Sequence, residues 1–302
     1  MTGLLSLLWS CFLGGALACG PEGYERAACG GDVRAHVPTA TGQGAPAVEP
    51  WAAAQEELVP GRQRRVRIML VGDSITAGYT DPPAWTVPFE FGYRGALYEL
   101  LQAQFPDQFV FVGQSPEPWD MRFGDPTRSA QPQPDLRVLG QDGHRGYGGW
   151  GTADVASHIE QWLDEDAPDL ILLMIGINDI PVESSSEPLQ AEANLHEIVE
   201  SIVRRRPSAV LLVAQSTPYL QPTPALDMYN AYIRDVLVPE FGDKNIAIVR
   251  LRQALLDERA NGNGDGNADP ALYSNGWNHP NQAGYNRIAR LWLEAIQRLP
   301  VH

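Results

Sequence analysis

Three short polar motifs contain residue types that together can carry out nucleophilic catalysis. They are Gly-Asp-Ser-Ile-Thr at 72–76, Gly-Ile-Asn-Asp at 176–179 and Asn-His-Pro-Asn at 278–281. A serine hydroxyl is a weak nucleophile until a base takes its proton, and the pKa of histidine suits that task near neutral pH. We therefore predict Ser74 as a nucleophile and His279 as its base.

These motifs lie at the ends of elements that alternate along the chain. Apolar runs predict strands at 66–72, 109–113, 169–176, 209–215 and 245–251, and amphipathic stretches predict helices at 93–104, 152–164, 189–205, 226–238 and 282–299. Thr152 is the expected N-cap of the second helix. Near-continuous apolar strands are typical of sheets covered on both faces. We expect an α/β domain, a three-layer, doubly wound (flavodoxin-like) parallel sheet of five strands.

Each motif residue also has an ordinary structural explanation. Ser74 could cap a helix, Asn178 could occupy a turn, and His279 could be a surface residue before a proline. Ligands of doubly wound sheets bind at the carboxyl ends of strands, so the placement of all three at element ends favours a functional site. The neighbouring Asp73 and Asp179 are interpreted as residues that brace loops through side-chain hydrogen bonds.

In this order, the motifs resemble those of the SGNH (GDSL-like) hydrolase family. A fourth motif, Gly-Tyr-Gly-Gly-Trp at 146–150, belongs to the same resemblance, which covers about residues 66–299. It implies an SGNH hydrolase fold and three donors for the oxyanion of an attacked ester: the Ser74 N–H, the Gly149 N–H and the Asn178 amide. Gly148 is the alternative glycine. The Gly-x-Ser-x-Gly motif of the α/β-hydrolase family does not occur in the sequence.

The sequence departs from the family at the third member of the catalytic triad. The family places an acid three residues before its histidine, where this chain has Gly276. The acid normally holds the imidazole tautomer and stabilises the imidazolium. The Gly276 carbonyl is the favoured substitute, as in family members that work with a dyad. The Asn275 side chain, Asp269 and Asp265 are the alternatives.

The stretch before this motif partly matches a calcium-binding loop. Oxygen donors occur at its first, third, fifth and ninth positions, with Gly266 at the sixth and Leu272 where a bidentate glutamate belongs. A structural calcium would therefore use Asn261, Asn263, Asp265 and Asp269. The alternative is an Asn/Gly-rich loop that binds no cation, and no other cofactor is expected.

A finer resemblance concerns the substrate. The segments 93–97, 111–113, 149–150 and 279–285 look like those of the third family of carbohydrate esterases, whose members remove acetyl groups from xylan and related sugars. This implies hydrolysis of O-acetyl or short-chain acyl esters on extracellular carbohydrate through a Ser74 acyl-enzyme. A lysophospholipase, a general short-chain esterase or thioesterase, and a non-catalytic glycan-binding module are the alternatives.

Aromatic residues in the predicted loops could contribute to a substrate rim. Trp150 and Trp277 are the main candidates, with Trp85 and Trp119 in neighbouring loops, because aromatic faces can stack on sugars. The alternative is that these tryptophans pack their loops onto the domain. His144 likewise either lines the pocket or has a structural role in its loop.

The N-terminal region predicts export. Residues 1–18 have the apolar stretch of a signal peptide, and Ala-Leu-Ala-Cys at 16–19 resembles a lipoprotein cleavage box, so either free secretion or a lipid anchor at Cys19 is expected. Residues 19–65 have the composition of a flexible linker, and 66–300 form the hydrolase domain. Cys11, Cys19 and Cys29 are the three cysteines, so that domain contains no cysteine-based zinc site.

The charge balance limits the partners. The 302 residues include 22 Lys and Arg against 37 Asp and Glu, which gives a net charge of −15. A nucleic-acid partner needs a dense cationic surface, so it is not expected. Neutral acylated small molecules or polysaccharides are easier partners for such a chain than anionic polymers.

Overall fold

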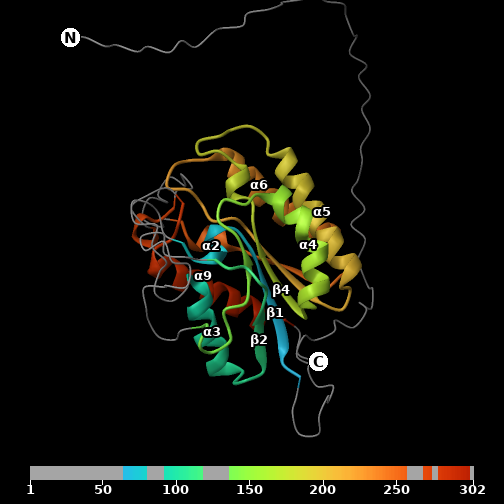
Figure 1. Ribbon diagram of the computed structural model, residues 1–302. Coiled ribbons are helices and arrows are strands. Elements are labelled where there is room, and N and C mark those ends of the chain that lie inside the picture. The colour runs from blue at the N-terminus through green and yellow to red at the C-terminus, as the bar shows by residue number, and fades with distance from the viewer. Residues whose placement is uncertain (1–63, 80–91, 118–135, 257–267, 274–277, 300–302) are drawn as a thin grey trace, which may run out of the picture. The chain divides into compact units, whose positions relative to one another are not determined.

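Five parallel strands form the centre of the computed structural model, which describes residues 64–79, 92–117, 136–256, 268–273 and 278–299 (Figure 1). The strands are β1 (Val66–Gly72), β2 (Phe109–Val112), β4 (Leu170–Met174), β5 (Val210–Ala214) and β6 (Ile246–Val249). Their order in the sheet is β2-β1-β4-β5-β6, and every pairing is parallel. The predicted doubly wound parallel sheet is therefore confirmed, and a sixth strand of two residues joins the five that the sequence predicts.

Long helices form the two outer layers. Helices α3 (Tyr93–Gln104) and α9 (Gln282–Gln297) pack together, and α4 (Thr152–Asp166) packs with α5 (Leu189–Arg205). The two pairs lie on opposite sides of the sheet in Figure 1. All residues of β4 and β5 are buried, as expected for strands between two helical layers. Burying each Leu, Ile or Val contributes ~1.5–3 kcal/mol, so these strands hold the sheet together.

Shorter elements connect these layers at several points. A two-residue strand, β3 (Arg145–Gly146), pairs with the end of β1, with Gly146 opposite Gly72. The predicted helix at 226–238 is divided into α6 (Pro224–Tyr232), the π-helical η2 (Ile233–Leu237) and α7 (Val238–Glu240). The one-turn α2 (Ser74–Ala77) and α8 (Leu251–Ala254) and the 3-10 turns η1 (Ile177–Asp179) and η4 (Pro270–Leu272) complete the described elements.

The expected N-cap of α4 is wrong by one residue. Gly151 is the N-cap, and Thr152 is the first residue of the helix. The Asp154 side chain accepts the Gly151 N–H at 2.9 Å, and the Asp179 carboxylate accepts the Thr152 N–H at 2.9 Å. The carboxylates of Asp154 and Asp179 therefore accept the first N–H groups of the helix, a role that the sequence pattern attributed to the Thr152 hydroxyl.

Several predictions concern residues outside the described part of the chain. They are the signal peptide and nearly all of the linker, the calcium candidates Asn261, Asn263 and Asp265, the triad substitutes Asn275 and Gly276, and the tryptophans Trp85, Trp119 and Trp277. Among the described residues, no helix has the length and apolar character needed to cross a bilayer.

The topology places the motifs at one edge of the sheet. The chain leaves β1 toward β2 on one side and later returns to β4 on the other side of β1. The crevice at the carboxyl ends of strands on either side of such a reversal is where doubly wound folds bind ligands. Ser74 lies two residues after the last residue of β1, and Asn178 lies in η1 shortly after β4.

Gly72 is required where β1 ends. A Cβ at this position would lie 2.3 Å from both the Met174 carbonyl oxygen and Thr76 Oγ1. We expect Gly72→Ala to lower the free energy of unfolding by ~1–3 kcal/mol, because neither the backbone of β4 nor α2 can move without disturbing the core. Urea denaturation measures this, with Gly242→Ala as the control, since its nearest contact is 3.1 Å away. Equal effects of the two substitutions would contradict the packing argument.

Candidate active site

The one-turn helix α2 holds Ser74 at its first position. The Asp73 side chain caps the helix by accepting the Ile75 N–H at 2.9 Å. At the other end, the buried Arg94 guanidinium donates to the carbonyl oxygens of Thr76 and Ala77, each at 3.0 Å. The backbone of this turn makes two bonds of its own, from the Ala77 N–H to Asp73 and from the Gly78 N–H to Ser74. Such a short helix leaves most of its other backbone groups without helical partners, so these side chains supply the further bonds that fix it.

His279 is positioned by the start of α9. Asn281 caps this helix by accepting the Gly284 N–H at 3.1 Å, and its amide donates to the carbonyl oxygens of Ala271 and Tyr273 at 2.9 and 3.1 Å. Tyr273 and Pro280 also form an antiparallel bridge. The residue before Pro280 is therefore anchored to η4 and α9 together.

Ser74 and His279 meet in the structure. His279 Nε2 lies 2.7 Å from Ser74 Oγ, and each residue is only 5% exposed. This separation is within the range for a serine hydroxyl that donates to a neutral imidazole. The pair has the geometry of an activated nucleophile and its general base.

The loop at 146–150 connects the Ser74 turn with η1. The Tyr147 N–H donates to the Gly72 carbonyl oxygen at 3.1 Å, just before the Ser74 turn. At the other end of the loop, Asn178 Nδ2 donates to the Trp150 carbonyl oxygen at 2.8 Å. The exposed Asn178 amide has a second N–H that this bond does not use.

The two candidate glycines differ in their hydrogen bonds. The Gly148 N–H donates to Glu117 Oε2 at 2.6 Å. Gly149 has a positive φ of 77° and open space around its Cβ position, and within the described part of the chain its N–H contacts no acceptor. Gly149 is therefore the glycine whose N–H is available to a ligand.

The two aspartates beside the motif residues bind backbone groups. Asp179 accepts both the Thr152 N–H and the Thr152 hydroxyl, the latter at 2.7 Å, and so ties η1 to α4. Asp73 is 2% exposed, and burial raises its pKa to about 7. The nearby charge of His279 lowers this pKa and that of Asp179 raises it. Both carboxylates thus have the bracing contacts predicted from the sequence.

His144 is a buried part of the loop scaffold. Its Nδ1 accepts the Gly146 N–H at 3.0 Å, so Nε2 carries the proton and donates to the Glu117 carbonyl oxygen at 2.6 Å. Burial lowers its pKa well below the ordinary value, with a further lowering by Arg94. Because both ring nitrogens are engaged, the structure gives His144 a role in the loop and not in the pocket.

Trp150 lies in a cluster of aromatic rings. It stacks on Tyr147 with ring centroids 4.3 Å apart and on Trp162 at 5.7 Å, and the ring of His158 lies 4.9 Å away. Offset-stacked rings at these separations favour packing of the loop onto α4. A contact of Trp150 with substrate stays a prediction.

Of the triad substitutes, only Asp269 can be located in the described part of the chain. It caps η4 by accepting the Ala271 N–H at 2.9 Å. As a calcium candidate it has no described companions, since no group of three or more His, Cys, Asp or Glu residues suited to a metal occurs among the described residues. The Asn275 side chain and the Gly276 carbonyl lie outside them.

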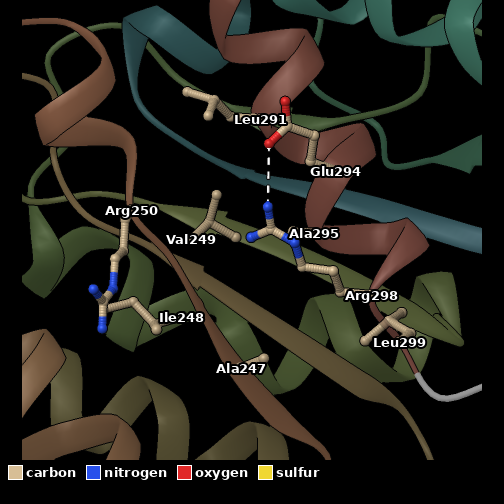
Figure 2. Close-up of a pocket in the computed structure, with 9 residues that line it drawn as sticks. All are labelled: Ala247, Ile248, Val249, Arg250, Leu291, Glu294, Ala295, Arg298 and Leu299. Atoms are coloured by element: carbon tan, nitrogen blue, oxygen red, sulfur yellow. Dashed lines mark hydrogen bonds and ion pairs between the residues drawn. The ribbon is translucent and has the colours of Figure 1, made fainter.

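A hollow elsewhere on the domain is not connected with these motifs. Figure 2 shows it between β6 and the C-terminal half of α9, lined by side chains such as Ile248 and Leu291. Glu294 and Arg298 pair with each other across its wall, with 3.4 Å between Arg298 Nη2 and Glu294 Oε2. None of the sequence-predicted site residues lines this hollow.

Sequence reasoning missed two residues of the site. Arg94 belongs to the quoted resemblance, but nothing in its spacing indicated that it would bind the carbonyls of α2. Glu117 lies in a Pro-rich stretch without periodicity, and only the folded structure brings it to Gly148.

The fold and this site agree with the comparisons to known proteins. The chain matches the GDSL-like Lipase/Acylhydrolase family over residues 70–287, and it therefore belongs to that family. The family resemblance that the motifs predicted is confirmed, and with it the class of enzyme, an SGNH-type ester hydrolase.

Among the similar proteins is a family 3 carbohydrate esterase from Clostridium thermocellum, 27% identical, with a TM-score of 0.52 over 78% of this chain and 98% of that one. A family 3 carbohydrate esterase from Talaromyces cellulolyticus shares the fold, with 20% identity and a TM-score of 0.56 over 78% of this chain and all of its own. A multidomain esterase from Ruminococcus flavefaciens is 26% identical over 252 residues, which are 77% of this chain. The chain spans 28% of that relative's length.

The buried Asp73 carboxyl predicts a pH-dependent stability. Its pKa of about 7 in the folded protein exceeds the 3.8 of an exposed aspartate, so the folded state binds the proton more tightly than the unfolded state. Its contribution to stability is therefore present at low pH and lost as the pH rises toward 7. We expect the free energy of unfolding of the wild type, relative to Asp73→Asn, to fall by up to ~4 kcal/mol between pH 4 and pH 8.

Urea denaturation of both proteins at several pH values measures this difference. Asn keeps an oxygen that can accept the Ile75 N–H, so the comparison isolates the titrating proton. A difference that does not change with pH would contradict the effect of burial on Asp73.

Proposed function

We propose that this protein hydrolyses O-acetyl or other short-chain acyl esters on extracellular carbohydrate through a Ser74 acyl-enzyme. The observation that carries the proposal is the 2.7 Å hydrogen bond between Ser74 Oγ and His279 Nε2 at the carboxyl end of β1. It is supported by membership of an acylhydrolase family and by the similar family 3 carbohydrate esterase at 27% identity.

The first half of the proposed reaction forms the acyl-enzyme. Ser74 Oγ attacks the carbonyl carbon of the ester while His279 Nε2 takes the hydroxyl proton, and the carbonyl oxygen becomes an oxyanion. The oxyanion then collapses, and the bond to the alcohol oxygen breaks. The imidazolium gives its proton to that oxygen, so the sugar hydroxyl leaves neutral.

The second half releases the acid. A water molecule gives a proton to His279 Nε2 as its oxygen attacks the acyl carbon. The second oxyanion collapses, the bond to Ser74 Oγ breaks, and Oγ recovers the proton from the imidazolium. Acetic acid leaves and ionises to acetate in water, and the serine and histidine return to their starting forms.

Three N–H groups are proposed to bind the oxyanion. The Ser74 N–H is at the first position of α2, where it has no acceptor within its own helix. The Gly149 N–H contacts no acceptor among the described residues, and the Asn178 amide has an N–H beyond the one given to Trp150. Fixed donors of this kind stabilise the developing charge without a cost of reorganisation.

For the third member of the triad, we propose the Gly276 carbonyl as the acceptor of the His279 Nδ1 proton. A carbonyl can hold the imidazole tautomer, although it stabilises the imidazolium less than a carboxylate would. The Asn275 side chain and Asp265 remain the alternatives. Asp269 is the least suitable of the four candidates, because its carboxylate already caps η4.

The substrate class follows from charge and from similar proteins. A net charge of −15 disfavours anionic polymers and anionic membrane surfaces, so neutral acetylated glycans are the proposed partners. Trp150 and Trp277 are proposed for the rim that contacts them. Export by the signal peptide at 1–18, with or without a lipid anchor at Cys19, would bring the enzyme to such substrates.

Loss of an oxyanion donor predicts a specific kinetic change. We expect Asn178→Ala to lower kcat on para-nitrophenyl acetate by about 100- to 1,000-fold with little change in KM, because the bond forms chiefly in the transition state. Asn245→Ala is the matched control, since its amide also donates to a carbonyl, that of Pro207 at 3.2 Å, but lies just before β6 starts. A KM effect without a kcat effect would contradict the assignment.

Two further measurements address the hydrolase itself. No activity of the wild type, or full activity of Ser74→Ala, would refute the esterase and favour a glycan-binding module. Acetate release from acetylated xylan, compared with fatty-acid release from lysophospholipid, then distinguishes a carbohydrate esterase from a lysophospholipase.

The dyad hypothesis makes its own prediction at Asp269. Asp269→Asn keeps an oxygen that can accept the Ala271 N–H, so we expect kcat to stay within a few-fold of the wild type. A fall by several orders of magnitude, with the protein still folded by circular dichroism, would identify Asp269 as the missing acid of the triad.

A further inference from the structure

The segment that follows β2 is hydrogen-bonded to the loop that precedes Gly149. The Ser115 N–H donates to the His144 carbonyl oxygen at 3.0 Å, and the Ser115 hydroxyl donates to the Gly146 carbonyl oxygen at 2.6 Å. His144 Nε2 donates to the Glu117 carbonyl oxygen, also at 2.6 Å. Three bonds therefore fix the backbone of 115–117 against the start of the 144–150 loop.

The Glu117 side chain extends this contact to two consecutive glycines, Gly148 and Gly149, which form the glycine pair. Its Oε2 accepts the Gly148 N–H at 2.6 Å, a short bond of the kind made by ionised acceptors. Burial raises the pKa of Glu117, while the bonds from the Gly148 N–H and the Tyr79 side chain oppose that rise. A half-buried carboxylate with two donors has a defined place, so it can act as a fixed acceptor.

The glycine pair needs such an acceptor. Consecutive glycines have the greatest backbone freedom, and Gly149 has a φ of 77° that other residues rarely adopt. The Trp150 N–H closes a turn over the two glycines by donating to the Tyr147 carbonyl oxygen at 3.3 Å, but nothing lies within 4 Å of the Cβ position of Gly149. The Glu117 bond fixes the Gly148 N–H one residue before the N–H that is proposed to bind the oxyanion.

We propose that Glu117 is a positioning residue that orients the Gly149 N–H through the Gly148 N–H, an inference that rests on the proposed esterase function. Its carboxylate acts on the loop through the Gly148 N–H and makes no described hydrogen bond to Ser74. Oxyanion stabilisation depends on donors that are already oriented before the charge develops, so a mobile glycine pair would lose part of it.

The substitution Glu117→Ala removes the acceptor. We expect kcat on para-nitrophenyl acetate to fall about 10- to 100-fold with KM unchanged, less than the loss of a whole oxyanion donor. Glu117→Gln offers an amide oxygen in place of the carboxylate, so we expect it to restore kcat to within about fivefold of the wild type. Glu197→Ala, an exposed acid on α5, is the matched control for a lost charge.

A readout independent of activity distinguishes this inference from the proposed function. In protein labelled with ¹⁵N-glycine, the Gly148 amide proton should resonate far downfield because of its short bond to a carboxylate, and Glu117→Ala should move it upfield and speed its hydrogen exchange. Gly148→Ala assigns the signal. This result is expected even if the wild type proves to hydrolyse no ester, in which case the proposed function fails first.

Three results would overturn the role of Glu117. One is an active wild type whose kcat is unchanged, within twofold, in Glu117→Ala. Another is a Gly148 amide signal and exchange rate that do not respond to Glu117→Ala. The third is a Glu117→Gln protein as slow as Glu117→Ala while both melt at the wild-type temperature, since a hydrogen-bond acceptor should be replaced by the amide.

Discussion

The hydrogen bond between Ser74 and His279 is the contact on which the account of this protein depends. The two residues are 205 positions apart, and they meet only because β1 lies in the middle of the sheet while α9 returns from the end of the chain to pack with α3. The bond can therefore form only when the sheet and the C-terminal helix are both in place. A shift of one ångström in either element would separate the nucleophile from its base, and such misplacements cost rate even when every side chain is present.

Two buried ionisable side chains fix the turn that carries Ser74, although burying their charged forms is energetically unfavourable. Burial lowers the pKa of Arg94 to about 10 and raises that of Asp73 to about 7, because it destabilises the charged form of each group. Both nevertheless bind the ends of the single turn that carries Ser74. Buried charges rarely contribute to stability, and the role of these two groups is to fix the geometry of the turn.

The sequence predicts the fold better than it predicts the site. The apolar runs of β1, β4 and β5 are long and almost uninterrupted, a pattern typical of parallel strands that are buried on both faces. In contrast, β3 is two residues of a Gly-rich loop, and the acid that holds Gly148 is thirty-one positions away at Glu117. Contacts between irregular segments leave no periodic signal, so no rule of local sequence could have found them. The motif residues Ser74 and His279 were found because their types, and not their neighbours, indicate chemistry.

In the proposed mechanism, His279 activates the Ser74 hydroxyl. An alkyl fluorophosphonate, which reacts with activated serines, tests it directly when the labelled protein is digested and its peptides are identified by mass spectrometry. We predict one adduct, on Ser74, that forms at least about 100-fold more slowly in His279→Ala, in line with the effect of removing a positioned general base. Labelling of another residue, or labelling of Ser74 at the same rate without His279, would contradict the account.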